Sequence, residues 1–400
     1  MAENARDAWI TGIGIVSCLG EGPEAHWRGL TAGDIKADVT TFAPFVVHPI
    51  APLNFDLQIP KKGDQRQMEA WQRIGTYAAG LALDSAGVKG KTDILSRMDM
   101  IVAAGGGERD VAVDGAILTG MAKAADPDAF LNERLMNDLR PTLFLAQLSN
   151  LLAGNISIVH GVTGSSRTFM GEEAAGVDAM RIAVSRIAAG QSEIALIGGA
   201  HNGERQDLLM LYEFGGHTLK DGHKPIWERG QGGHTGGLAL GSLGAFLVLE
   251  SRKHAQARGA RPLAKITAVE AGRSNRKEGA LRRSLTSLWE TIKGKLKPGY
   301  AVLSGASGAA PATADEHAFL KELGNGIAVR ATGTYLGHGL EPQFPMNIAL
   351  AAIALGRGTL FPPRDATGLE QPATTAPSQI VVTGVGHWRG EGLALIERAD

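Results

Sequence analysis

The sequence predicts a layered α/β protein built from two halves. Three observations lead to this fold class: short apolar runs alternate with segments of helical period, the chain has 400 residues, and a basic stretch divides the pattern. A chain of this length exceeds the usual size of one domain and is long enough to bury a large core. Hydrophobic residues make up 44% of it, so we expect a folded rather than a disordered protein.

The first half alternates strands and helices from its beginning. WITGIGIV at 9–16 predicts a β-strand, and apolar residues at helical spacing from Met68 to Leu81 predict a helix that Gly87 ends. A second helix is expected at 172–189, with Gly190 as its terminator. The remaining strands predicted in this half are 99–104, 155–159, 194–197 and 245–249.

A basic segment, SRKHAQARGARP, lies between the two alternating patterns at 251–262. We expect it to be a surface connection between an N-terminal half at residues 1–252 and a C-terminal half at residues 253–400. The second half then repeats the alternation. Its predicted strands are 263–269, 301–303, 380–382 and 393–396, and its predicted helices are 277–295 and 344–356.

Composition excludes several classes of function. The net charge is −1 and no basic stripe is present, so nucleic acid is not expected as a partner. The longest apolar runs fall short of the ~18 residues of a membrane-spanning helix, and MAENARDAW at the start has no signal core. We therefore expect a soluble cytoplasmic protein without membrane insertion. A single cysteine, Cys18, excludes internal disulfides and a multi-cysteine metal site, and no metal or other cofactor is expected.

Common catalytic motifs are weak or missing. Gly12 and Gly14 follow a strand, but Ser17 stands where a dinucleotide fingerprint has its third glycine. The sequence contains no phosphate-binding P-loop and no HExxH zinc motif. The turns around Ser165 and Ser307 lack the GxSxG pattern of a nucleophilic serine.

Several segments, taken in order, carry a resemblance that covers nearly the whole chain. They are ITGIGIVSCLGEGPEAHWRGLTAG near the start, KKGDQRQMEAWQRIGTYAAGLALDSAG at 61–87, GAFLVLE at 244–250 and LGHGLEPQFPMNIALAAIAL at 336–355. This order resembles the elongating β-ketoacyl-acyl-carrier-protein synthases of the thiolase-like superfamily. The resemblance implies a thiolase-like α-β-α-β-α fold with two pseudo-repeated halves and a role in fatty acid or polyketide biosynthesis.

The family joins acyl units by decarboxylative condensation, with a cysteine thiolate, two histidines and a lysine. Counting backwards from IGGA at 197–200 puts the cysteine position at Glu173, whereas counting forwards from NISI at 155–158 puts it at Val162, with extra residues at 161–171. A packed helix accepts insertions less easily than a loop, so the first count is preferred. The resemblance assigns the other positions as follows: Ser304 for the first histidine, Gly333 for the lysine, His338 for the second histidine and His387 for the phenylalanine of the gating loop.

One subgroup of this family departs in the same way. GEEAAGVDAM at 171–180 resembles the EQAGGLDAL text of chain-length factors, which lack the cysteine and pair with an active ketosynthase. The resemblance implies a non-condensing subunit that forms a heterodimer with such a ketosynthase, or a homodimer, and binds acyl carrier protein. Lys62 and Arg66 match the basic helix that meets the acidic carrier, although an ordinary solvated face explains them equally well.

Other interpretations of these residues stay open. The protein could be a 3-oxoacyl synthase with a remodelled site, or a malonyl-carrier decarboxylase that uses His338. His338, between two glycines, is also compatible with a turn residue, and His387 with Trp388 is compatible with a packed loop that fills an unused tunnel. First-turn acids stabilise a helix by about 0.3–1 kcal/mol, which accounts for one exposed acid but not for an acid at a buried helix end.

Overall fold

The computed structural model describes residues 6–139, 147–229, 236–324 and 326–399. The first five residues, at the start of the segment checked for a signal peptide, lie outside this part. The strands are β1 (Ala8–Ser17), β2 (Gly20–Glu21), β3 (Val47–His48), β4 (Asp99–Ala103), β5 (Ser166–Phe169), β6 (Ile194–His201), β7 (Leu240–Gly241), β8 (Leu243–Ser251), β9 (Ala264–Gly272), β10 (Ala301–Ser304), β11 (Ala328–Ala331), β12 (Gln379–Val385) and β13 (Glu391–Glu397).

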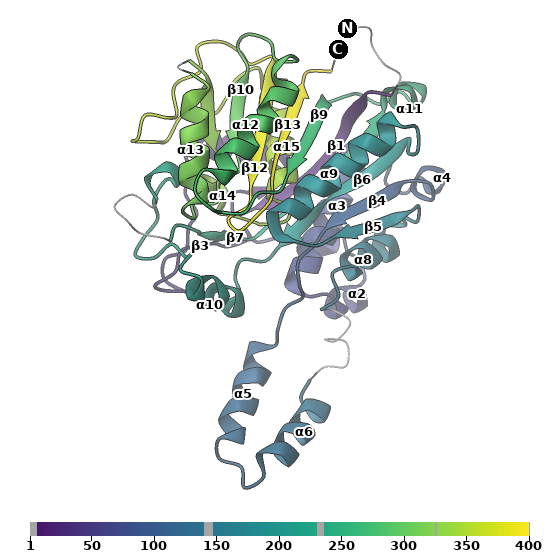
Figure 1. The fold of residues 1–400 in the computed structure, drawn as a ribbon. Helices are drawn as coiled ribbons and strands as arrows, with labels where there is room; N and C mark the ends of the chain where they lie inside the picture. Colours follow the sequence, from purple (N-terminus) through teal and green to yellow (C-terminus); the bar gives the residue numbers. More distant parts are fainter. Residues whose placement is uncertain (1–5, 140–146, 230–235, 325, 400) are drawn as a thin grey trace.

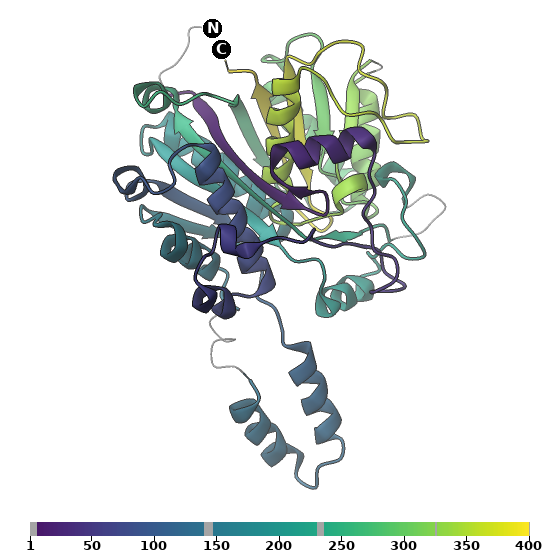
Figure 2. The same cartoon turned by 180° about the vertical axis from the view of Figure 1, so that it is seen from behind.

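Helices cover both faces of the sheet and fill the space between its halves (Figures 1 and 2). They are α1 (Gly22–Ala32), α2 (Lys62–Gln67), α3 (Ala70–Ser85), α4 (Thr92–Leu95), α5 (Val111–Met121), α6 (Pro127–Asn137), α8 (Leu151–His160), α9 (Glu172–Ala188), α10 (Gln206–Phe214), α11 (Arg252–Ala257), α12 (Ala280–Lys293), α13 (Ala312–Glu322), α14 (Gly333–Leu336) and α15 (Gln343–Arg357), with 3₁₀ helices η1 (Phe55–Leu57) and η2 (Ile226–Glu228).

The main sheet contains the same five-strand arrangement twice. Its order is β5-β4-β6-β8-β1 followed by β9-β13-β12-β10-β11, with β2 added beside β1. In each half the first strand of the chain pairs antiparallel with the last, and the last pairs antiparallel with the fourth. The second, third and fourth strands are parallel to one another. The two halves meet where β1 pairs with β9 through Ala8–Ile266, Trp9–Lys265 and Ile10–Ala264.

The layers follow from which helix packs on which strands. α3 and α8 cover the outer face of the first half, and α12 and α13 cover the outer face of the second. α9 and α15 contact each other and strands of both halves, so they form a central layer between them. The layered α-β-α-β-α fold that the resemblance implied is confirmed. The division of the chain at residues 252 and 253 stays a prediction.

The sequences of the helices fit these positions. α12 is amphipathic, with Leu281, Leu285, Leu288 and Ile292 recurring at helical spacing on its buried side. α15 is apolar almost all round, and every residue from Gln343 to Leu355 is buried. An apolar surface on all sides requires neighbours on all sides, which is why α15 lies between the two halves of the sheet.

One sequence expectation is wrong. Residues 155–159 form part of α8 rather than a strand, and the strand of this region is β5, which pairs parallel with β4. The residues at 161–171 that the forward count treated as extra therefore contain this strand, and the reason for placing the cysteine position at Val162 disappears. The basic segment expected as a surface connection contains the short helix α11. Arg258, directly after this helix, makes an ion pair with the buried Glu250.

α5 and α6 form a helical hairpin that projects away from the body of the molecule (Figures 1 and 2). They pack against each other, and of their residues only Ile117 is buried. No helix in the described part of the chain is long and apolar enough to cross a membrane.

Candidate active site

The site is built at the point where β5 turns into α9. Gly171, just before α9, has φ 131°, and Glu172, the first residue of the helix, has φ 54°, so two successive residues have positive φ. The conformation of Gly171 suits glycine, whereas Glu172 carries strain because its Cβ crowds the backbone in this region. Strain of this kind concentrates at functional sites. The turn aims Glu173, in the first turn of α9, into the interior, where it is 3% exposed.

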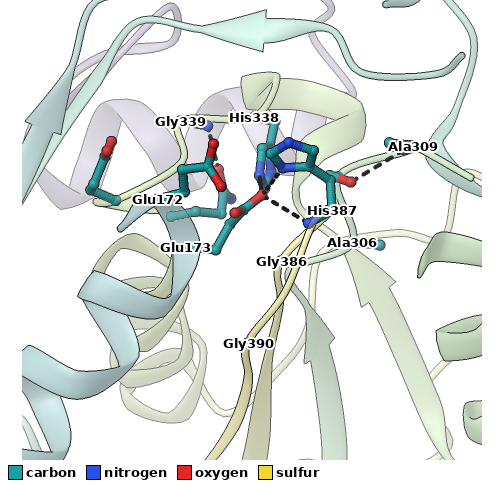
Figure 3. Close-up of polar contacts among 12 residues, drawn as sticks. Glu172, Glu173, Ala306, Ala309, His338, Gly339, Gly386, His387 and Gly390 are labelled. Atoms are coloured by element: carbon teal, nitrogen blue, oxygen red, sulfur yellow. Dashed lines mark hydrogen bonds and ion pairs between the residues drawn. The ribbon is translucent and has the colours of Figure 1, made fainter. Parts of the chain in front are cut away.

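One oxygen of Glu173 accepts three hydrogen bonds (Figure 3). Glu173 Oε1 lies 2.8 Å from Nε2 of His338, which follows α14, and 3.0 Å from Nδ1 of His387, which lies between β12 and β13. The backbone N–H of His387 donates to the same oxygen at 3.2 Å. Each imidazole therefore carries a proton on the nitrogen that faces Glu173. The structure brings together three of the residues that the sequence singled out.

The three hydrogen bonds keep this carboxylate ionised inside the protein. Burial alone would raise the pKa of Glu173, but the charge on His387 and hydrogen bonds from His338 and His387 lower it well below its usual value. Burial opposes charge on His387 as well, yet the Glu173 carboxylate raises the pKa of this imidazole. The two side chains therefore stabilise each other's charged forms in the interior. The amino end of α9 adds favourable partial charge beside Glu173.

A second group of polar side chains surrounds this centre, and sequence reasoning missed it. Tyr212 of α10 stacks edge-on against His387, and its hydroxyl lies 3.5 Å from Glu172 Oε1. His201, at the end of β6, has Nδ1 3.7 Å from Oε2 of Glu341, which precedes α15. Burial raises the pKa of Glu341 to about 8, and burial lowers the pKa of His201 to about 3. These residues form no sequence motif, because they lie far apart in the chain and come together only in the folded structure.

Ser304 and Gly333 do not join the hydrogen bonds around Glu173. Ser304, at the end of β10, donates its hydroxyl to Glu316 Oε1 at 2.8 Å and accepts from the N–H of Ala306. A Cβ at Gly333 would lie 3.0 Å from Ile226 Cδ1 and 3.2 Å from the carbonyl oxygen of Ala306. A lysine at Gly333 therefore requires its neighbours to shift. The roles that the resemblance assigned to these positions stay predictions.

Two cavities border the site. An open cleft of about 580 Å³ is lined by His387, Trp388 and three arginines, Arg273, Arg276 and Arg389, among others. On the other side a cavity of about 180 Å³ is lined by glycines 105–107, Trp71 and Leu208 together with polar groups. Those polar groups are Glu172, His201, Asn202, Arg205, Tyr212 and Glu341. The remaining lining of this smaller cavity is apolar and comes from Ala200, Leu211 and Leu340.

The predicted carrier-binding residues lie away from these cavities. Lys62 and Arg66 are both exposed on the short helix α2, and neither lines the cleft or the smaller cavity. Lys62 Nζ makes an ion pair with Asp56 at 2.5 Å. Both basic groups are therefore accessible to a partner.

The sequence matches known proteins along most of its length. Residues 5–255 match the family model of the β-ketoacyl synthase N-terminal domain. The chain is 25% identical over 270 residues to 3-oxoacyl-[acyl-carrier-protein] synthase 2 of Vibrio harveyi, a match that covers 64% of this chain and 60% of that protein. It is also 25% identical over 378 residues to the oxytetracycline polyketide β-ketoacyl synthase 1 of Streptomyces rimosus, covering 90% of this chain and 87% of that one.

Solved structures share the fold over the whole chain. The ishigamide ketosynthase/chain length factor has a TM-score of 0.78 at 19% identity and covers 99% of this chain and 100% of its own. A type II polyketide ketosynthase in complex with its acyl-carrier protein has a TM-score of 0.74 at 16% identity, with 98% of this chain and 100% of that chain covered. Identities this low establish the architecture alone.

Proposed function

The chain belongs to the β-ketoacyl synthase family, and from this membership we propose that it is a non-condensing partner subunit of an active ketosynthase. The observation that supports the proposal is the buried carboxylate of Glu173, which holds His338 and His387 at the amino end of α9. Condensation needs a thiolate that accepts the acyl chain and later leaves. We propose that Glu173 occupies that nucleophile position and that the chain works in the cytoplasm.

The only cysteine does not replace the missing thiolate. Cys18 follows β1, is 7% exposed, and donates its thiol to the carbonyl oxygen of Tyr335. Burial raises the pKa of this thiol to about 12, so it stays protonated at neutral pH. The histidine that a decarboxylase would use is also engaged, because Nε2 of His338 is bound to Glu173. This arrangement speaks against both the remodelled synthase and the decarboxylase.

An activity assay tests the first part of the proposal. The purified chain, mixed with acyl- and malonyl-loaded carrier protein, should form no 3-oxoacyl product, because no thiolate is present to take the acyl group. A known condensing ketosynthase, assayed with the same carriers, is the positive control. Product that forms with the wild-type chain and disappears in Glu173→Ala would contradict the proposal.

The projecting hairpin supports the second part, the partner. Leu118 on α5 is 69% exposed and Met136 on α6 is 76% exposed, and the hairpin projects away from the body of the molecule (Figures 1 and 2). β5 ends the sheet order, with Met170 exposed directly after it. Exposed apolar groups and an unpaired strand edge are typical of a surface that a second protein covers. We propose that an active ketosynthase covers both.

Co-expression with the ketosynthase encoded by the same organism tests the pairing. Native mass measurement should give a one-to-one heterodimer, and Leu118→Asp with Met136→Asp should reduce its formation at least tenfold. Leu57→Asp is the matched control, because Leu57 is 61% exposed on η1, outside the hairpin. A homodimer that persists in the presence of the ketosynthase would overturn the heterodimer and favour a plain carrier-binding dimer.

Carrier binding is the third part. We propose that acyl carrier protein docks on Lys62 and Arg66 of α2, whose positive charges suit an acidic partner. Reversing both charges should weaken binding of the carrier to the heterodimer and remove most of its salt dependence. Unchanged binding in the variant would place the docking surface elsewhere.

A further inference from the structure

Three carboxyl groups, those of Glu172, Glu173 and Glu341, gather at this site, and none of them makes an ion pair with a strong base in the described part of the chain. Glu173 and Glu341 are 3% and 4% exposed, and Glu172 precedes Glu173 in the chain. The nearest basic groups are imidazoles: His338 and His387 bond to Glu173, and Nδ1 of His201 lies 3.7 Å from Oε2 of Glu341. Buried carboxylates are normally paired with cations or bound to a metal.

The side chains present the donor atoms of a metal site. One ligand atom each from Glu172, Glu173 and His387 lies within 4.8 Å of the others (Figure 3). Glu173 Oε1 and His387 Nδ1 are 3.0 Å apart. This is the separation of two neighbouring ligands at about 2.1 Å from one ion. Glu172 borders the 180 Å³ cavity and has room to adjust.

Unpartnered atoms give a second, independent sign of a missing ligand. Glu173 Oε2 is buried and makes no hydrogen bond, and neither does Nδ1 of His338. Oε2 of Glu341 is also without a hydrogen bond, and Glu341 lines the same cavity as Glu172. Leaving a buried polar atom unpaired costs about 1–3 kcal/mol, so several at one place indicate an absent group.

We propose that Glu172, Glu173 and His387 bind a divalent transition-metal ion. Two carboxylates and one imidazole are donors that suit Zn²⁺ and its neighbours in the first transition row. His338, bonded to Glu173 Oε1, orients that carboxylate, as hydrogen-bonded neighbours of metal ligands commonly do. The remaining coordination positions face the cavity that Glu341 and His201 line and are filled there by water.

The ion takes the place of the proton that now joins Glu173 to His387. Coordination through Nδ1 releases that proton to solvent, so the metal replaces the internal hydrogen bond between His387 and Glu173. Sequence patterns do not reveal the site because the ligands come from α9 and from the turn after β12, more than 200 residues apart. The site is independent of the proposed partner role.

Titration of the full-length chain with Zn²⁺ tests the proposal. The chain, without an affinity tag and stripped of metal with a chelator, should bind one Zn²⁺ per molecule with micromolar or tighter affinity. Co²⁺ in its place should give visible absorption bands that respond to the ligand set. Glu172→Gln, Glu173→Gln and His387→Gln should each weaken binding at least tenfold.

Matched controls separate this site from chance binding at the surface. His317→Gln on α13 removes a half-buried imidazole elsewhere and should leave the affinity unchanged. Circular dichroism checks the folding of Glu173→Gln, because this change alters a buried side chain. Glu172 is partly exposed, so Glu172→Gln keeps the test valid if Glu173→Gln unfolds. Absence of one-to-one Zn²⁺ binding, or binding that Glu172→Gln and His387→Gln leave intact, would overturn the proposal.

Discussion

Glu316 shows at the scale of a residue how the interior controls a single proton. The carboxyl lies in α13, wholly buried, and accepts hydrogen bonds from the hydroxyls of Ser304 and Thr383. Burial raises the pKa of Glu316 to about 7, because neither hydroxyl brings a charge to offset the loss of water. At the position where the resemblance places the first catalytic histidine, the structure has Ser304, which donates a hydrogen bond to Glu316.

The pH dependence of stability should report this proton. The pKa of Glu316 is higher in the folded state than in the unfolded state. Glu316 therefore contributes stability that is complete below pH about 4.5 and is lost as the pH rises through about 7. The loss is about 3 kcal/mol, at about 1.4 kcal/mol for each unit of pKa difference. Glu316→Gln cannot ionise. Its free energy of unfolding, measured with urea at pH 5 and pH 8, should improve relative to wild type by about that amount at the higher pH.

An exposed acid provides the control for this measurement. Glu290→Gln changes a solvated glutamate that pairs with Lys293 on the surface of α12. Its stability should follow that of the wild type at both pH values, within a few tenths of a kcal/mol, as expected for a surface pair. If the free energies of unfolding of Glu316→Gln and of the wild type changed equally between pH 5 and pH 8, the buried carboxyl of Glu316 would not hold its proton in this range.

At the scale of the element, the closest helix contact of the site lies between α9 and the start of α15. A Cβ added at Gly176 of α9 would lie 2.3 Å from the carbonyl oxygen of Glu341 and 3.0 Å from Pro345 Cδ. Real side chains do not approach a backbone oxygen so closely, so Gly176 is needed for the two helices to meet. The contact holds Glu173 and Glu341 at their relative positions.

Two glycine substitutions in helices should have opposite effects. Gly176→Ala should lower the free energy of unfolding by about 1–3 kcal/mol, because the added methyl overpacks the contact with Glu341. Gly154→Ala in α8 should raise it by up to about 1 kcal/mol, because the nearest side-chain atom is 3.7 Å away and alanine is the better helix former. Denaturant unfolding measures both. Equal effects of the two changes would mean that the close approach at Gly176 does not constrain α9.

The elements also show what sequence patterns predict and what they do not. The helix expected at 172–189 matches α9, and the apolar helix expected at 344–356 matches α15, because long periodic segments determine their own structure. The strand expected at 155–159 failed because Leu151 to Ala153 extend the same apolar run into a helix that packs on α3. The sequence did not predict β5, because its four residues, SRTF, are few and partly exposed at the edge of the sheet.

The residues of the candidate site likewise fall into those that sequence patterns predict and those that only the fold brings together. Glu173, His338 and His387 were found because each lies in a segment with a recognisable order of residues, and the structure joins them through one carboxylate oxygen. His201, Tyr212 and Glu341 lie in segments without such a signature. Only the folded sheet, which brings the ends of β6, α10 and the turn before α15 to one place, reveals them.

At the scale of the whole molecule, the central helices join the two halves of the sheet into one unit. Ile348 of α15 is fully buried in the core that also contains Ile10 and Val382, one from each half. A change at this position should therefore affect both halves together. The direct link between the halves is small by comparison, since β1 and β9 pair through only the three residue pairs given above.

Ile348→Ala should lower the free energy of unfolding by about 2–5 kcal/mol and leave a single transition. Hydrogen exchange should show faster opening of amides in β4–β6 and in β10–β12 alike. Ile158→Ala, at a position 73% exposed on α8, should change stability by less than about 0.5 kcal/mol. Faster exchange confined to β10–β12 would show that the halves open separately.

The place of β1 also governs when the protein can fold during synthesis. Apart from β2, which pairs with its last two residues, its partners in the sheet are β8 and β9, which begin at Leu243 and Ala264. The first strand to leave the ribosome must therefore wait for more than 200 further residues, which takes roughly 10–50 s at about 5–20 residues per second. During that time all of β1 except its last two residues has no strand partner, and an unpaired apolar strand of this kind makes a nascent chain prone to aggregation.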